Sequence, residues 1–113
     1  MKTETKKFLL TCVLALATLF IPIVFGHNQL LSIGLLLITS LLMLSMNWSY
    51  GYLIFFILVL ISGPAAEATA IHFGTWRYED PFFFGVPIWL PLVWGNAGLY
   101  IVRLWSFIDS HRK

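Results

Sequence analysis

The sequence predicts an all-α integral membrane protein, built as a four-helix bundle with short loops. Of its 113 residues, 59% are hydrophobic and 11% are charged, whereas a soluble domain carries about 25% charged residues. One helical span needs about 20 apolar residues, and four apolar runs of roughly this length follow one another along the chain. We therefore expect residues 1–113 to form a single transmembrane domain.

The first predicted span covers residues 8–25 and follows three lysines. This order resembles the start of a signal peptide, and Ala15-Leu16-Ala17 resembles a cleavage site. Because the apolar run continues past that point, we expect an uncleaved anchor. Cys12 lies within this run, where we expect a packed thiol.

The remaining predicted spans cover residues 30–46, 50–73 and 83–105. The polar segments 26–29 and 47–49 are each short enough to be tight turns between antiparallel neighbours. The connection between the third and fourth spans is longer and carries both aromatic and charged residues. It is therefore the part of the chain outside the spans with the most polar chemistry.

Lysine and arginine gather near the two ends of the chain, with three lysines before the first span and Arg103, Arg112 and Lys113 at the end. The positive-inside rule places both ends in the cytoplasm, which an even number of spans permits. We expect a bacterial inner membrane protein with both termini cytoplasmic. Asn47-Trp48-Ser49 matches a glycosylation sequon, but it falls on the cytoplasmic side, so we assign it no modification.

Glu67 is the only acidic residue inside any of the apolar runs. An ionisable side chain at membrane depth is costly and therefore marks a candidate functional site. Pro64, one turn earlier, frees a backbone carbonyl and is expected to kink the helix. Small residues allow a close approach of another helix, and here they follow helical spacing at Gly63, Ala66, Ala70 and Gly74.

Two interpretations of Glu67 stay open at this stage. In the structural one, a protonated Glu67 hydrogen-bonds a freed carbonyl or a tryptophan indole and locks helices together. In the functional one, burial disfavours the ionised carboxylate and keeps Glu67 as an acid that donates a proton to a substrate. His72 and Arg77 lie close enough in sequence to influence it.

The fourth predicted span contains Pro87 and Pro91, which interrupt helical hydrogen bonding. Broken helices at membrane depth persist where they are packed in protein or line a cavity. A semi-polar stripe at three- and four-residue intervals is expected to face Glu67 and the bundle interior; it comprises Trp89, Val93, Asn96, Tyr100 and Arg103.

Three pieces of the chain, taken together, resemble integral-membrane carotenoid-biosynthesis proteins, a group with the carotenoid hydratases and the heterodimeric lycopene cyclases. The pieces are Glu67, Phe73-Gly74-Thr75-Trp76-Arg77-Tyr78 and Gly85-Val86-Pro87-Ile88-Trp89-Leu90-Pro91-Leu92-Val93-Trp94. The resemblance implies acid chemistry on isoprenoid chains. A carboxylic acid would protonate a double bond, and aromatic faces would stabilise the resulting cation.

We therefore expect an isoprenoid or carotenoid-like lipid to bind in an aromatic cleft around Glu67, which would be the catalytic acid. The expected substrate-binding residues are His72, Trp76, Arg77, Tyr78, Trp89, Trp94 and Asn96. No cofactor, metal site or nucleic-acid partner is expected. The alternative is a non-catalytic small subunit or assembly partner of a larger membrane complex, and in either case an oligomer or complex is expected. A minimal transporter or channel element is a third possibility.

Overall fold

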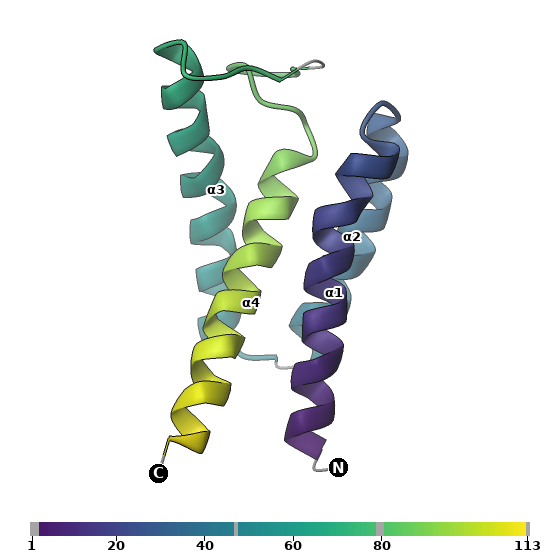
Figure 1. The fold of residues 1–113 in the computed structure, drawn as a ribbon, viewed down its shortest axis with the longest axis vertical. Helices are drawn as coiled ribbons and strands as arrows, with labels where there is room; N and C mark the ends of the chain where they lie inside the picture. Colours follow the sequence, from purple (N-terminus) through teal and green to yellow (C-terminus); the bar gives the residue numbers. More distant parts are fainter. Residues whose placement is uncertain (1–2, 47, 79–80, 113) are drawn as a thin grey trace.

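The computed structural model describes residues 3–46, 48–78 and 81–112, and these residues form four antiparallel helices (Figure 1). The predicted all-α four-helix fold is confirmed. The second and third helices lie within one residue of the predicted spans, and the first begins five residues earlier than expected. The four elements are α1 (Thr3–Phe25), α2 (Gln29–Met46), α3 (Tyr50–His72) and α4 (Leu90–His111).

Helices α1, α2 and α3 are long and apolar enough to cross a membrane. Their large apolar side chains face outward, as at Leu16, Ile38 and Ile57. The interior contains small hydroxyl residues such as Ser32 and Ser40, whose exposed fractions are at most 1%, together with an apolar cluster that includes Phe56 and Leu99. Small and hydroxyl-bearing residues at helix contacts are typical of helices that associate in lipid.

Helix α4 lies between α3 and the α1–α2 pair (Figure 1). It packs against all three other helices, and its contact with α3 is the most extensive in the described part of the chain. Helix α3, by contrast, packs extensively against α4 alone within the described residues. The site described below depends on this arrangement, because α4 separates α3 from α1.

Asn96 joins three helices at the centre of the bundle. Its side chain is fully buried. The Oγ of Ser40 on α2 donates a hydrogen bond to Asn96 Oδ1 at 2.6 Å, and Asn96 Nδ2 donates to the Oγ1 of Thr18 on α1 at 3.1 Å. An amide in an apolar interior requires such partners, so these contacts fix the relative positions of α1, α2 and α4.

Glycines permit the close contact between α3 and α4. A Cβ atom added at Gly95 would lie 2.6 Å from the Phe56 ring, and one at Gly98 would lie 2.9 Å from Val59. The predicted small-residue face of α3 is found only in part. Gly63 is buried against α4, whereas Ala66 and Gly74 are exposed. The α4 glycines, which the sequence interpretation overlooked, supply the rest of the contact.

The fourth predicted span, residues 83–105, is wrong at its start, because α4 begins only at Leu90. Before it, Phe83 and Val86 pair in a tight turn in which Phe84 and Gly85 have positive φ angles of 47° and 83°. Pro87 follows this turn outside the helix, and Pro91 lies in the first turn of α4, where a missing N–H costs no helical hydrogen bond. The expected broken helix is therefore a loop followed by an intact helix.

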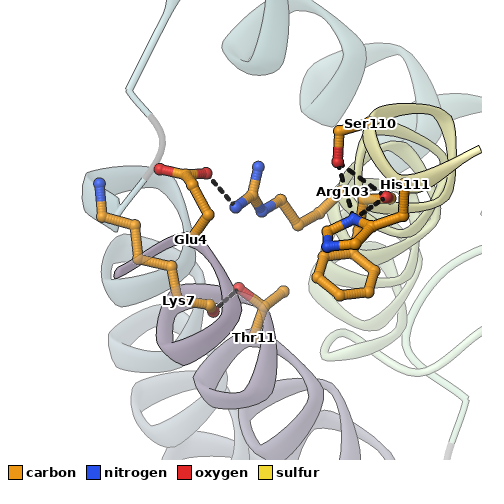
Figure 2. A network of polar contacts seen from close by, with 7 residues as sticks. Glu4, Lys7, Thr11, Arg103, Ser110 and His111 are labelled. Atoms are coloured by element: carbon orange, nitrogen blue, oxygen red, sulfur yellow. Dashed lines mark hydrogen bonds and ion pairs between the residues drawn. The ribbon is translucent and has the colours of Figure 1, made fainter. Parts of the chain in front are cut away.

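The two chain ends lie at the same end of the bundle (Figure 1). There Arg103 Nη2 forms an ion pair with Glu4 Oε2 at 2.8 Å, joining α4 to α1 (Figure 2). Phe8 and Phe107 stack beside it with ring centroids 4.1 Å apart. Arg103 is both one of the basic residues near the C-terminal end and a member of the stripe expected to face the bundle interior; its side chain is only 10% exposed and belongs to this helix contact. Asn47 of the sequon lies outside the described residues.

Candidate functional site

Glu67 lies in the last part of α3, five residues before the helix ends at His72, which places it about 7.5 Å from that end. Trp94 Nε1, from α4, donates a hydrogen bond to one oxygen of its carboxylate. Tyr78 Oη, from the loop after α3, donates to the other oxygen. The carboxyl group of Glu67 therefore joins α3, α4 and the loop between them.

The Trp94 indole reaches Glu67 because it lies across Gly63. Gly63 is one helical turn before Glu67 and therefore on the same face of α3. A Cβ atom added at Gly63 would overlap the Trp94 ring system. The absence of a side chain at this position thus determines where the indole N–H lies.

Tyr78 is half-buried and packs edge-on against Trp89, with ring centroids 6.1 Å apart and planes at 88°. Burial raises the pKa of Tyr78 well above the ordinary value of a phenol, and the hydrogen bond to Glu67 raises the pKa further. The neutral phenol is therefore the form that donates to Glu67 over the whole physiological pH range.

A cavity of about 350 Å³ opens beside the Glu67 carboxylate. Helix α1 contributes Leu19, Pro22 and Ile23 to its wall. The loop and α4 contribute Tyr78, Trp89, Leu90, Val93, Trp94 and Ala97. The walls are thus aliphatic and aromatic, and Glu67 is the only residue among them with an acidic side chain. Such a cavity, mostly apolar with few polar groups, is typical of a small-molecule site.

The carboxylate retains capacity to accept further hydrogen bonds. The two oxygens of a carboxyl group offer several lone-pair positions, and two donors are present here. An indole has one polar proton and a phenol has one, so Trp94 and Tyr78 both use theirs on Glu67. These three groups therefore present acceptors to a ligand, while Trp89 in the same wall carries an indole donor. A ligand end that can both donate and accept, such as a hydroxyl, fits this set.

The structure brings four of the eight predicted site residues together at this cavity: Glu67, Tyr78, Trp89 and Trp94. Arg77 is exposed and lines an adjoining cavity of about 320 Å³, which shares Tyr78 and Trp89 with the first. A bound molecule with a polar end near Tyr78 would therefore lie close to Arg77.

The other three predicted residues do not line this cavity. Asn96 is bonded to Thr18 and Ser40 in the bundle interior. His72 is exposed, lies edge-on to Phe73 and lines a separate cavity beside Phe84. Trp76 is 45% exposed in the loop. Glu79 and Asp80, the acidic residues shortly after Arg77, lie outside the described residues.

The α1 residues at the cavity were missed from the sequence. Leu19, Pro22 and Ile23 are ordinary members of an apolar run, and no local pattern distinguishes them. Pro22 is the exception, because a proline inside a helix is uncommon and can be recognised from the sequence. These α1 residues reach the cavity because α1 packs against α4. The residue pattern within α1 alone does not predict that packing.

No protein-family model matches this chain, and no similar protein is found among the curated proteins or the solved structures. Within residues 3–46, 48–78 and 81–112, no group of three or more His, Cys, Asp or Glu side chains is placed to hold a metal ion. The chemistry of the site therefore has to be argued from Glu67 and its neighbours.

Proposed function

We propose that this protein binds an isoprenoid or similar lipid in the cavity beside Glu67. One observation carries the proposal: a carboxylate fixed by two donors opens onto an otherwise apolar cavity between α1, α3 and α4. Bilayer lipid can enter such a cavity directly. Glu67 would then select for a ligand with a polar end, because its carboxyl group and the bonded Tyr78 hydroxyl lie in an otherwise mostly apolar wall.

We place the protein in a bacterial inner membrane with both termini in the cytoplasm. The common position of the two chain ends supports a topology with an even number of spans. The clustering of lysine and arginine near those ends supports the cytoplasmic side. In this orientation the Glu67 cavity opens toward the outer leaflet.

The hydrogen bonds of Glu67 support a role in ligand binding better than a role in acid catalysis. A proton donor would need a protonated oxygen directed at the substrate. Trp94 can only donate, so the oxygen that it contacts is an acceptor. The other oxygen lies at Tyr78, and protonation there would direct the proton to the phenol oxygen rather than into the cavity.

The test is to purify the protein in mild detergent and identify the lipids that remain bound by mass spectrometry. We expect a bound lipid in the wild type and its loss in Glu67→Ala. Thr69→Ala is the matched control, because Thr69 is on the same helix but exposed, and its hydroxyl donates to the backbone carbonyl of Ala65 in that helix. Identical bound-lipid profiles in all three proteins would contradict the proposal.

A second candidate function is that of a small subunit in a larger membrane complex. It is favoured by α3, which packs extensively against α4 alone in the described structure and exposes a row of aliphatic residues, among them Ile54, Leu58 and Ile61. A partner helix would cover this flank. Foreign chains that co-purify in fixed stoichiometry, and are lost on Leu58→Arg, would support this function.

A further inference from the structure

A second apolar cavity continues from the Glu67 cavity along the groove between α1 and α4. It has a volume of about 460 Å³ and extends past Cys12, Leu16, Tyr100 and Ile101. Both cavities are lined by Leu19, Val93 and Ala97. The two cavities therefore adjoin at these three side chains, and we call the surface that they line together the α1–α4 groove.

The α1–α4 groove has one polar end and one apolar end. Trp94, which contacts Glu67, and Tyr100, which contacts Cys12, are six residues apart on α4, or about 9 Å along the helix axis. The lining residues on α4 and just before it run from Trp89 to Ile101, which corresponds to about 18 Å. These lengths suit one extended hydrocarbon chain rather than a compact ligand.

Polar side chains away from Glu67 are engaged within the protein. Thr18 donates to the Leu14 carbonyl at 3.0 Å and accepts from Asn96. The Cys12 thiol donates a hydrogen bond to the Tyr100 hydroxyl, with the sulfur 3.9 Å from the oxygen. The far part of the groove thus offers a ligand mainly apolar contact, and the polar interaction is concentrated at Glu67.

We propose that the α1–α4 groove binds a single-chain lipid alcohol, with its hydroxyl at Glu67 and its chain running toward Cys12. This rests on the proposed function and adds the class and direction of the ligand. Glu67, Tyr78 and Trp94 leave only acceptor positions, which a hydroxyl proton fills. A hydroxyl also costs far less to remove from water than a charged carboxylate, phosphate or ammonium end.

Two photoreactive farnesol analogues test the direction, with the full chain in mild detergent. One carries its diazirine beside the hydroxyl, and the other carries it at the far end of the chain. We expect the first to label the segment around Trp89 and Trp94, and the second to label Leu16 or Ile101. An excess of unlabelled farnesol or dodecanol should remove both signals, and the better competitor identifies the preferred chain as branched or straight.

Ala97→Trp tests the groove itself, because Ala97 lies where the two cavities meet. Filling this position should reduce labelling by the far-end analogue about tenfold, while labelling beside the hydroxyl persists. Leu37→Trp on the outward face of α2 is the control, since Leu37 is 47% exposed and lines neither cavity. Glu67→Gln, which removes acceptor capacity, should weaken labelling by both analogues.

The outcomes separate the two proposals. Competable labelling near Trp94, with far-end adducts scattered over outward-facing residues, would overturn the direction and leave lipid binding at Glu67 intact. Labelling that no competitor removes at either end would overturn both. If Ala97→Trp does not fold, the adduct positions in the wild type still decide the direction.

Discussion

Glu67 is held in an apolar setting because two different elements each supply it with a hydrogen-bond donor. Of the two interpretations drawn from the sequence, the structural one correctly included a tryptophan indole as partner. The contact does not by itself exclude a role in binding. The same two bonds that join α3, α4 and the loop also fix the carboxylate at the edge of a cavity, so one residue serves both purposes.

Replacing Glu67 separates its acceptor role from its charge. In Glu67→Gln the amide oxygen can accept from Trp94 while the amide nitrogen donates to the Tyr78 oxygen, so we expect nearly wild-type thermal stability. Glu67→Ala leaves both donors without an acceptor and should lower the free energy of unfolding by about 1–3 kcal/mol. Melting of both variants in the same detergent measures this, and equal losses would contradict it.

Tyr78 should make stability depend on pH in the alkaline range. Burial and the bond to Glu67 raise the pKa of Tyr78 in the folded protein, so the folded protein holds this proton more tightly than the unfolded chain. The resulting stabilisation is present below the ordinary phenol pKa of about 10 and is lost as the pH rises through the folded-state value.

Tyr78→Phe should therefore be less stable than the wild type at neutral pH, and this difference should shrink as the pH rises above about 10. Melting curves recorded from neutral to strongly alkaline pH measure the difference. Tyr50→Phe is the control, because Tyr50 is exposed at the opposite end of α3. A stability difference that stays constant over this range would be inconsistent with the bond to Glu67.

At the scale of elements, the contact between α3 and α4 depends on glycines from both helices. We expect Gly63→Ala to destabilise the protein by about 1–3 kcal/mol, because the new methyl group overlaps the Trp94 ring. Gly34→Ala is the matched control on α2. A Cβ atom there meets nothing within 4 Å, so the higher helix propensity of alanine should leave stability unchanged or raise it by up to about 1 kcal/mol. Equal melting temperatures would argue against the contact.

Asn96 should show coupling to its partner across helices. Asn96→Ala and Ser40→Ala each remove one side of the buried hydrogen bond between α4 and α2. A double-mutant cycle on the free energy of unfolding should give a coupling of about 0.6–2 kcal/mol, the range seen between helices in membranes. Strictly additive effects of the two substitutions would show that this hydrogen bond adds no stability.

The helices were predictable to the extent that hydropathy alone defines them. Residues 30–46 and 50–73 were placed almost correctly because polar turns bound them on both sides. The start of α4 was not, because the stretch before Leu90 is as apolar as a span. What prevents a helix there is backbone geometry, namely the positive φ angles at Phe84 and Gly85 and the proline at position 87. Hydropathy indicates neither the backbone φ angles nor the effect of the proline.

The candidate site was predictable around Glu67 and much less so elsewhere. A lone acidic residue in an apolar run stands out by its cost, and tryptophans on the next helix are natural partners. Asn96 shared their spacing but faces α1 and α2 instead, because α4 contacts three helices rather than one. Leu19 and Ile23 entered the site only through tertiary packing.

At the scale of the whole molecule, the buried polar residues describe how the bundle is held together. Hydroxyl groups and Asn96 lie inside together with an apolar cluster that includes Met43, Phe56 and Leu99, while many bulky aliphatic side chains face out. Exposed aliphatic side chains in this number are stable where the surroundings are apolar. Transfer to water without detergent should therefore favour aggregation over the isolated bundle.

Orientation follows from where lysine and arginine lie, because the positive-inside rule counts these residues rather than net charge. Lys6 and Lys7 in the first turns of α1, and Arg103 and Arg112 at the end of α4, all lie near the shared end of the bundle. Because Lys and Arg near spans are retained in the cytoplasm, we expect that end to be cytoplasmic. The loop after Tyr78 should then face outward.

Two fusions measure this orientation in bacterial cells. Alkaline phosphatase, which is active only outside the cytoplasm, should be active when inserted after Tyr78 and inactive after Arg112. A fluorescent protein that matures in the cytoplasm should give the opposite pattern. Replacing all three N-terminal lysines with glutamine should weaken the preference, while Glu4→Gln should leave it unchanged because acidic residues contribute little to orientation. Phosphatase activity after Arg112 with none after Tyr78 would invert the topology and place the Glu67 cavity at the cytoplasmic leaflet.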